Sequence, residues 1–320
     1  MYGGVVRSPG YQSDLCAFIR SAYGLEARAL TPAQRGYFGE TWRLDAREGR
    51  YFLKLVYAEA HKARYARSFP VMAHMRRHGV TAISRALPTC AGELCAAYDT
   101  AVLGVFDWID GENLQNQRTK RAEYRILGQV YAVPVADVPI ARDTLGTQSA
   151  DTFYAQWDQL AGGAPGEAAR AVLAVLTAHR ARLAHRAQRL ALFARRCADD
   201  TAPACITHGD AGGNIIEQGD AHYLVDWDDP LLAPPERDAW FCLHWDWALA
   251  AFHSALRENG IAYTLRTERL AYYCYHSFFT YLTEYMQTFL ERERADMAQA
   301  LTDYFACWIE EEIAYADKLP

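Results

Sequence analysis

Three oxygen-bearing side chains lie at the ends of two short apolar segments in the middle of the chain. Asp210 and Asn214 precede the first segment, and Asp226 follows the second, residues 223–225. The polar residues 217–220 between the segments are typical of a hairpin turn, which would return Asp226 to the side of Asp210 and Asn214. Carboxylate and amide oxygens that converge in this way suit Mg²⁺ and the phosphates of a nucleotide. The pattern therefore indicates phosphoryl transfer.

Phosphoryl transfer asks for little covalent chemistry from a protein. One group must orient the acceptor hydroxyl and take its proton, while metal ions neutralise the phosphates. We expect Asp210 to be this base, Asn214 and Asp226 to bind Mg²⁺, and His208 to brace the loop. The segment from His208 to Asp210 is, by itself, also typical of a capped turn. Residues 205–240 contain eight acidic residues and a single arginine, an imbalance that favours bound cations nearby.

The composition is that of an ordinary globular protein. The chain has 320 residues, of which 51% are hydrophobic and 22% charged, enough for a full core and suggestive of two lobes. A net charge of -6 and a pI near 5.9 argue against nucleic acid or anionic membranes as partners and are compatible with a cationic ligand. We find no signal peptide or membrane span, so we expect a cytoplasmic protein. The eight cysteines lack metal-ligand spacing and are expected to be reduced.

Hydrophobic patterns predict that the N-terminal third forms strands and short helices. Residues 11–24 have the spacing of an amphipathic helix. Residues 27–56 change to a period of two around the polar turn 45–49, which predicts a hairpin. We expect one more helix and two more strands, over residues 61–78, 93–98 and 101–106.

Lys54 is flanked by apolar residues within the predicted strand 52–56. A lysine in a buried strand needs an anionic partner to offset its desolvation, and a nucleotide phosphate would supply one. The alternative is an edge-strand lysine whose stem lies along apolar surface. The preceding loop, residues 35–41, contains two glycines that let backbone amides approach phosphates.

The pattern changes near residue 106, where an apolar strand gives way to an acidic turn, and we place a lobe boundary there. Beyond it the spacing is helical almost throughout, including residues 119–132, 167–197 and 240–315. We expect the acidic runs Glu291 to Glu293 and Glu310 to Glu312 to lie on solvated helix faces.

The central segment is similar to one known family. The resemblance rests on His208-Gly209-Asp210 with Asn214, on Asp226-Trp227-Asp228, and on the run from Ala233 to Asp238. Together these residues resemble the aminoglycoside phosphotransferase and choline kinase-like superfamily, which shares the bilobal protein-kinase fold. The sequence from Asp226 to Asp238 is most similar to the spectinomycin phosphotransferase branch. The match is specific over residues 205–241, and elsewhere it rests on the order of the elements.

The resemblance implies an α+β, protein-kinase-like fold with two lobes. A small antiparallel β-sheet lobe, residues 1–106, would bind the nucleotide, and a large, mainly helical lobe, residues 107–320, would carry catalysis and the substrate. The resemblance also implies the following roles: Asp210 as catalytic base, Asn214 and Asp226 as Mg²⁺ ligands, Lys54 on the α- and β-phosphates, the backbone of Phe106, Asp107, Trp108 and Ile109 on adenine, and Asp238 as a brace for the catalytic loop.

Two features depart from the family pattern. Only Ala211, Gly212 and Gly213 separate Asp210 from Asn214, whereas the family usually has four residues there. The paired glycines would let a shorter loop reach the same geometry. In addition, the predicted helix 61–78 offers no glutamate to pair with Lys54, and Glu59 lies just before it.

The acceptor is expected to meet the loops facing Asp210 and the helical C-terminal third. Carboxylates and aromatic faces suit a protonated aminocyclitol, and the expected contacts are Asp228, Asp229, Trp240, Trp245 and Asp246. Any one of these tryptophans is equally at home in a helical core.

The leading hypothesis is an ATP- and Mg²⁺-dependent O-phosphotransferase acting on a small cationic molecule. The expected acceptor is an aminoglycoside or spectinomycin-like aminocyclitol, which would confer antibiotic resistance. The alternatives are a metabolic kinase for choline, an amino alcohol or a sugar, and a catalytically degenerate kinase fold that only binds ligands. The sequence leaves open the modified hydroxyl, the choice of ATP or GTP, and the oligomeric state.

Overall fold

The chain forms two compact units. The computed structural model describes residues 9–33, 39–163, 165–198 and 203–320. The first unit comprises residues 1–142, 205–232 and 258–261, and the second comprises residues 143–204, 233–257 and 262–320. The lobe boundary expected after residue 106 lies inside the first unit, and the division into a nucleotide-binding lobe and a catalytic lobe stays a prediction.

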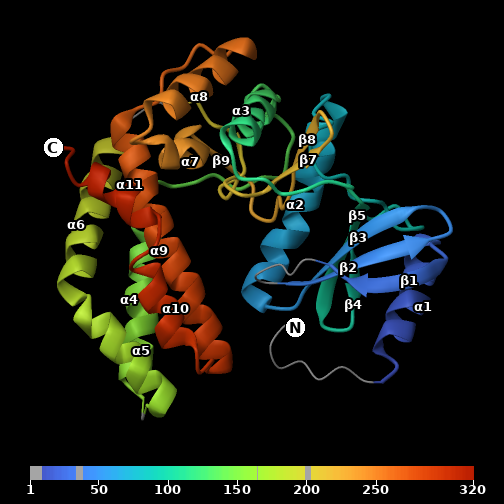
Figure 1. Ribbon diagram of the computed structural model, residues 1–320, viewed down its shortest axis with the longest axis horizontal. Helices are drawn as coiled ribbons and strands as arrows, with labels where there is room; N and C mark the ends of the chain where they lie inside the picture. Colours follow the sequence, from blue (N-terminus) through green and yellow to red (C-terminus); the bar gives the residue numbers. More distant parts are fainter. Residues whose placement is uncertain (1–8, 34–38, 164, 199–202) are drawn as a thin grey trace. The chain divides into compact units, whose positions relative to one another are not determined.

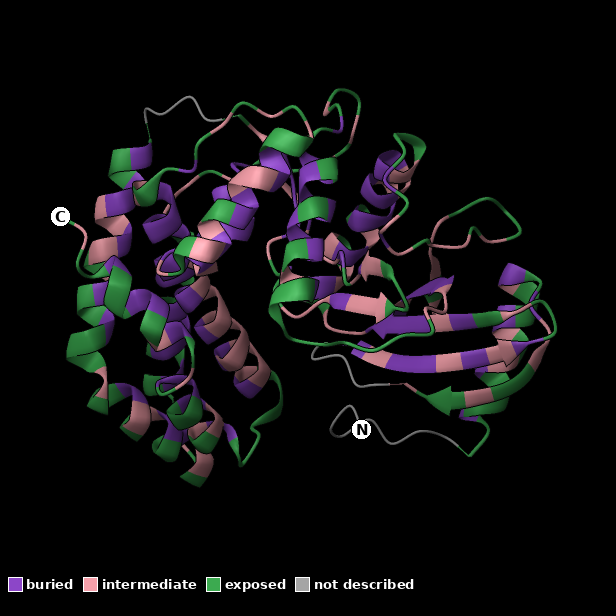
Figure 2. Ribbon diagram, turned by 45° about the horizontal axis from the view of Figure 1, so that its top comes forward, coloured by how far each residue is buried: buried purple, intermediate pink, exposed green. Residues whose placement is uncertain are grey.

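The first unit contains a five-stranded antiparallel sheet with the order β1-β2-β3-β5-β4 (Figure 1). Its strands are β1 (Ala27–Pro32), β2 (Gly39–Ala46), β3 (Arg50–Val56), β4 (Ala96–Tyr98) and β5 (Ala101–Asp107). The predicted hairpin over 27–56 is found as β2 and β3, with Thr41 opposite Lys54. Of the predicted glycine loop, residues 35–38 lie outside the described residues. The edge strand β1 is largely exposed, whereas β3 and β5 are mostly buried (Figure 2).

The two faces of the sheet are covered by different helices, because successive side chains of a strand point to opposite faces. Leu53 and Leu55 of β3 share a core with α1 (Tyr11–Tyr23). The alternate residues of β3 and β5 face α2 (Glu59–Arg77), where Phe106 stacks on Phe69 with ring centroids 5.6 Å apart. Lys54 therefore lies on the face covered by α2.

The predicted central hairpin is formed by β7 (Ile215–Gln218) and β8 (Ala221–Leu224). Its turn is tighter than expected: Gln218 pairs with Ala221, so only two residues make the turn instead of residues 217–220. The hairpin packs against α3 (Gln117–Tyr131), which also contacts β6 (Cys205–Thr207). Strand β6 in turn pairs with β9 (Leu231–Ala233). Helix α3 thus contacts the strands on both sides of the loop formed by residues 208–214.

The second unit is helical. Its elements are α4 (Gln148–Ala161), α5 (Glu167–Ala178), α6 (Arg180–Cys197), α7 (Glu236–Ala239), the 3-10 helix η1 (Trp240–Cys242), α8 (Asp246–Glu258), α9 (Thr267–Arg292), α10 (Met297–Tyr304) and α11 (Ile309–Ala316). Helix α9 lies beside α4, α6, α10 and α11 (Figure 1). It buries aromatic side chains along its length. Within the ranges that the structure describes, no helix has both the length and the apolar character needed to cross a bilayer.

One prediction about surface charge is wrong for the last helix. Glu291 and Glu293 are exposed as expected, but Glu312 is only 4% exposed. Glu310 accepts two hydrogen bonds from Arg186, at 2.8 and 2.5 Å. The acidic run at 310–312 therefore faces partly into the helical core, because α11 packs against α9.

Candidate active site

Lys54 is buried in the middle of β3, with 7% of its surface exposed. Its Nζ contacts Oδ1 of Asp226 and lies 2.6 Å from Oδ2 of Asp228. A buried ammonium group requires such partners, since its desolvation would otherwise oppose folding. Lys54 is therefore an ion-paired lysine within the first unit, and the alternative of an edge-strand lysine lying along apolar surface is wrong.

The two carboxylates come from a turn that directly follows β8. Asp226 has a backbone φ of 67°, a left-handed conformation that non-glycine residues seldom adopt and that aspartate tolerates better than most. Asp228 donates its N–H to the Asp226 carbonyl at 2.9 Å, and Trp227 between them is buried, with Nε1 donating to the Leu224 carbonyl at 3.0 Å. The buried tryptophan anchors the turn and leaves the two flanking carboxylates directed at Lys54.

The charges of this cluster shift one another's pKa. Burial lowers the pKa of Lys54, but Asp226 and Asp228 more than offset this, so that its pKa is raised and it stays protonated. Burial raises the pKa of Asp226, but the ammonium of Lys54 outweighs it and the pKa is lowered. Burial and the charge of Asp226 together raise the pKa of Asp228. The side chains of Asp226 and Asp228 are still 42% and 31% exposed, so both can be reached by a ligand.

The loop after β6 carries the predicted base and its brace. His208 is buried, and its Nδ1 accepts a hydrogen bond from the Asp210 N–H at 3.3 Å. Its Nε2 lies 2.9 Å from the Val225 carbonyl, so this nitrogen carries the proton and donates. The ring of His208 packs on Trp227 with centroids 4.5 Å apart. His208 thus links the loop of Asp210 to the turn of Asp226, as expected of a brace.

Asn214 closes the same loop. Its Nδ2 donates to the Asp210 carbonyl at 2.6 Å, and its own carbonyl accepts from the Val225 N–H at 2.9 Å. Because the amide nitrogen is used inside the loop, the side-chain oxygen Oδ1 is the atom that remains for a cation. The oxygens of Asn214 and Asp226 fit Mg²⁺, which takes one or two protein ligands and completes its shell with phosphates and water.

A cavity of about 300 Å³ joins these residues to the predicted nucleotide site. The predicted residues that line it are Lys54, Phe106, Asp107, Trp108, Ile109, Asn214 and Asp226, and Asp228 lines it as well. Asp210 does not line this cavity but is exposed one hydrogen bond away from Asn214. The structure thus brings together all predicted nucleotide and metal residues, with the predicted base at their side.

The walls of the cavity suit a flat apolar base. Phe52, Met72, Ile216 and Val225 contribute to its lining. Two backbone N–H groups of the predicted adenine-binding segment are already used, since Asp107 donates to Arg85 and Trp108 donates to Arg50, both at 3.1 Å. These two N–H groups are therefore not available to a nucleotide base.

Helix α2 contributes residues that the sequence analysis missed. Arg64 contacts His61 and lies 3.5 Å from Asp229, and Tyr65 donates from its hydroxyl to the Lys54 carbonyl at 3.4 Å. Burial and the neighbouring charges of Arg64 and Lys54 lower the pKa of His61 to about 4, so His61 is neutral at neutral pH. His61, Arg64 and Tyr65 are spaced at i, i+3 and i+4, so they share one face of α2. This spacing is the feature of the sequence that could have identified them.

Lys54 pairs with aspartates and not with a glutamate. Glu59 is an exposed residue at the start of α2 and pairs with Lys62. Asp228, which was expected to contact the acceptor, instead pairs with Lys54, and Asp229 lies beside Arg64.

The remaining predicted residues belong to the second unit. Asp238 is buried in α7, and Trp240 is 3% exposed and stacks on Trp308 with centroids 5.6 Å apart. Trp245 is 45% exposed, and Asp246 begins α8. Trp240 therefore packs into the helical core, while Trp245 offers an open aromatic face. The roles assigned to these residues stay predictions.

Comparisons with known proteins agree with this geometry. A family model described as a phosphotransferase enzyme family matches residues 29–273. Among curated protein sequences, none matches this chain. The fold is similar to that of a spectinomycin phosphotransferase solved with ADP and spectinomycin, with a TM-score of 0.75, 16% identity, and 98% of this chain and 99% of that chain covered.

Two further solved structures are similar. One is a choline kinase from Streptococcus pneumoniae, with a TM-score of 0.58, 12% identity, and 96% and 98% of the two chains covered. The other is an amicoumacin kinase solved with AMP-PNP and Ca²⁺, with a TM-score of 0.61, 13% identity, and 97% and 94% covered. These likenesses confirm the predicted fold class, an α+β fold of the bilobal protein-kinase type.

Proposed function

Because this chain belongs to the phosphotransferase enzyme family, we propose that it transfers the γ-phosphoryl group of ATP, or of GTP, to a hydroxyl of a small cationic molecule. Membership confirms the predicted resemblance and the predicted enzyme class, a small-molecule kinase. The observation that carries the proposal is the single cavity of about 300 Å³ shared by Lys54, Asn214 and Asp226.

The residues have distinct tasks in this proposal. Asp210 orients the acceptor hydroxyl and accepts its proton as the oxygen attacks the phosphorus. Lys54 donates to the phosphates, and Asn214 and Asp226 hold Mg²⁺. When bound, Mg²⁺ neutralises charge on the phosphates. His208 keeps the peptide of Asp210 in place through its Nδ1.

The choice of nucleotide is supported by the similar structures, and the choice of metal is supported by them and by the ligand atoms of this chain. The similar structures were solved with ADP in one case and with AMP-PNP and Ca²⁺ in another. The oxygen ligands of this chain are of the kind that Mg²⁺ prefers.

The leading acceptor is an aminoglycoside or a spectinomycin-like aminocyclitol, whose phosphorylation would give antibiotic resistance. It is supported by the likeness to a spectinomycin phosphotransferase over almost the full length of both chains, and by the net charge of -6. A second candidate is a metabolic kinase for choline or an amino alcohol, favoured by the likeness to a choline kinase. A ligand-binding protein without chemistry ranks third, motivated by the short loop between Asp210 and Asn214.

Mass spectrometry of a mixed acceptor pool tests these candidates. The enzyme is incubated with Mg·ATP and a pool of aminoglycosides, aminocyclitols, choline and amino alcohols, and the acceptor that gains a phosphate is identified. Asp210→Asn serves as the matched control and should slow the transfer by about 10² to 10⁴-fold. Phosphorylated choline alone would support the second candidate. Binding of Mg·ATP without any phosphorylated product would support the third, and full turnover by Asp210→Asn would remove Asp210 as the base.

A further inference from the structure

We propose that Asn113 is a positioning residue that holds the short catalytic loop, so that Asn214 faces the cavity and binds Mg²⁺. Asn113 belongs to residues 110–116, which end the segment between β5 and α3 and which we call the strap. The inference rests on the proposed function, because it concerns the metal site of that reaction.

The strap is paired with the hairpin like an additional short strand. Glu112 donates its N–H to the Glu217 carbonyl at 2.9 Å and accepts from the Glu217 N–H at 2.8 Å. At Gly111 a Cβ atom would lie 2.3 Å from the Glu217 carbonyl oxygen, so only glycine allows this close approach. The backbone of the strap is therefore fixed against β7, the strand that begins directly after Asn214.

Asn113 reaches from the strap to the catalytic loop. Its Nδ2 donates a hydrogen bond to the carbonyl oxygen of Gly213. Gln115 donates from Nε2 to Oδ1 of Asn113 at 2.7 Å, which fixes the amide with its nitrogen toward the loop. Gln115 therefore holds the side-chain amide of Asn113 in the orientation in which Nδ2 donates to Gly213.

The peptide that accepts this hydrogen bond also contains the nitrogen of Asn214. Since a peptide unit is planar, fixing the carbonyl of Gly213 also fixes the direction in which the chain enters Asn214. Gly213 has a φ of 97°, a conformation open mainly to glycine, and Gly212 precedes it. The loop closes on itself through hydrogen bonds from Asn214 to the carbonyls of Asp210 and Ala211. Its two glycines still give the backbone freedom before Asn214, and the hydrogen bond from Asn113 restrains the loop there from outside.

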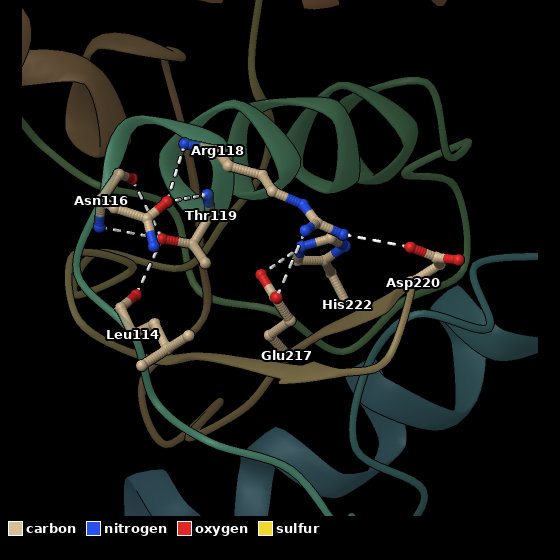
Figure 3. Close-up of polar contacts among 7 residues, drawn as sticks. All are labelled: Leu114, Asn116, Arg118, Thr119, Glu217, Asp220 and His222. Carbon is tan, nitrogen blue, oxygen red and sulfur yellow. Dashed lines mark hydrogen bonds and ion pairs between the residues drawn. The ribbon is translucent and has the colours of Figure 1, made fainter.

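The C-terminal end of the strap and the hairpin β7–β8 are both anchored to the first turn of α3 (Figure 3). The side chain of Asn116 accepts from the N–H groups of Arg118 and Thr119 at 2.8 and 3.1 Å, and Thr119 Oγ1 donates to the Leu114 carbonyl at 2.7 Å. At the hairpin, Arg118 lies 3.2 Å from Asp220 and 3.6 Å from Glu217. The strap is therefore a rigid support from which Asn113 can act.

The test measures how Mg²⁺ strengthens nucleotide binding, which does not require turnover. ADP affinity is measured by calorimetry over a series of Mg²⁺ concentrations for the wild type, Asn113→Ala, and Leu114→Ala as the matched control, because Leu114 is an exposed neighbour in the same strap. Mutation of a residue that orients a metal ligand without binding the metal typically lowers metal affinity by about 10 to 100-fold. We expect Asn113→Ala to need about tenfold more Mg²⁺ for the same effect, with equal ADP affinity at saturating Mg²⁺, and Leu114→Ala to match the wild type.

Gln115→Ala provides a second variant that leaves Asn113 in place but frees its amide, and it should shift the Mg²⁺ requirement in the same direction by a smaller factor. Hydrogen exchange of the amides at 211–214 should be faster in both variants without any ligand. An unchanged Mg²⁺ requirement in both variants would overturn the inference and leave the proposed function standing. Equal loss of ADP affinity at every Mg²⁺ concentration would also overturn it, since Asn113 would then contact the nucleotide. A wild type without any Mg²⁺ effect would overturn the proposed function and the inference together.

Discussion

The ammonium nitrogen of Lys54 lies 2.6 Å from Oδ2 of Asp228. The same ammonium contacts Asp226, so one buried cation is shared by two carboxylates that leave the same turn. The arrangement places a positive charge in the lining of the cavity, where we propose that the phosphates of a nucleotide bind. It also explains how β3 carries a charged side chain with only 7% of its surface exposed.

Replacing Lys54 by methionine should reduce kcat/KM for ATP by about 100-fold, because a fixed charge that stabilises the transferring phosphates is removed. The measurement is the initial rate of phosphotransfer at varied ATP. Lys62→Met is the matched control, since Lys62 lies on α2 and pairs with the exposed Glu59. Its rate should stay within about twofold, as expected for a surface ion pair. Equal rates for both variants would contradict the assigned role of Lys54.

Gly104→Ala should destabilise the first unit by about 1 to 3 kcal/mol, because overpacking a core forces its neighbours to move. A Cβ atom at this position would lie 2.5 Å from the hydroxyl of Tyr65 and 2.6 Å from the ring of Phe69. Urea denaturation measures the free energy of unfolding. Gly163→Ala is the control, since Gly163 is exposed and its Cβ would meet only the Leu160 carbonyl oxygen, at 3.9 Å, and it should change stability by less than about 0.5 kcal/mol. A neutral Gly104→Ala would show that α2 can shift freely on the sheet.

Arg186→Met should lower the free energy of unfolding by about 1 to 3 kcal/mol, because it leaves the Glu310 carboxylate without its bidentate partner. The Arg186 side chain is 5% exposed, and its guanidinium also lies 4.4 Å from the ring centroid of Phe278. Arg182 is the matched control on the same helix, being 43% exposed and 3.6 Å from the same carboxylate. Arg182→Met should cost less than about 1 kcal/mol.

A double variant distinguishes pairing from packing at this position. If the loss in Arg186→Met comes from the unpaired charge, adding Glu310→Met should restore most of the stability. A double variant as unstable as the single one would mean that the contact of Arg186 with Phe278 carries the effect.

Glu312 should make the protein less stable as the pH rises. Burial, together with the nearby charge of Glu311, raises the pKa of Glu312 from 4.5 to about 8. Its neighbour His244, with Nδ1 at 3.0 Å, does not supply a full counter-charge, since burial lowers the pKa of that histidine. Between pH 4.5 and about 8, the Glu312 carboxyl group keeps its proton in the native state and has released it in the unfolded state. The contribution is therefore complete below pH 4.5 and is lost as the pH rises through about 8.

Glu312→Gln should remove this dependence and be more stable than the wild type at pH 8 by about 1 to 3 kcal/mol, which is the usual cost of burying an uncompensated polar group. Thermal unfolding at pH 5, 6.5 and 8 measures it. Glu311→Gln provides the control, because Glu311 is exposed on the same helix. Parallel pH profiles for the wild type and Glu312→Gln would contradict this account.

Much of the fold followed from local patterns. The period of two in residues 27–56 predicted β2 and β3, and the spacing of apolar residues predicted α1, α2 and α3. The convergence of Asn214 and Asp226 was predicted from the hairpin, because antiparallel strands return the chain to the side from which it left. The structure places both residues at one cavity, while their roles as metal ligands stay predictions.

Other features depend on contacts that no local pattern encodes. Lys54 and Asp228 are 174 positions apart, and nothing near Lys54 in the sequence indicates an aspartate partner. The burial of Glu312 arises where α11 packs on α9, while the sequence shows only a run of three glutamates. The hydrogen bond from Asn113 to Gly213 joins a polar linker to a glycine, two residue types with weak preferences. Long-range pairings of this kind are decided by tertiary packing.

The left-handed backbone of Asp226, with its φ of 67°, limits how position 226 can be probed by saturation mutagenesis. A β-branched or bulky replacement changes two properties at once, removing a carboxylate and forcing the turn out of its conformation. Asparagine and glycine tolerate this conformation, so they isolate the loss of charge. If Asp226→Val loses more activity than Asp226→Asn, the additional loss would thus report on backbone geometry rather than on the missing carboxylate.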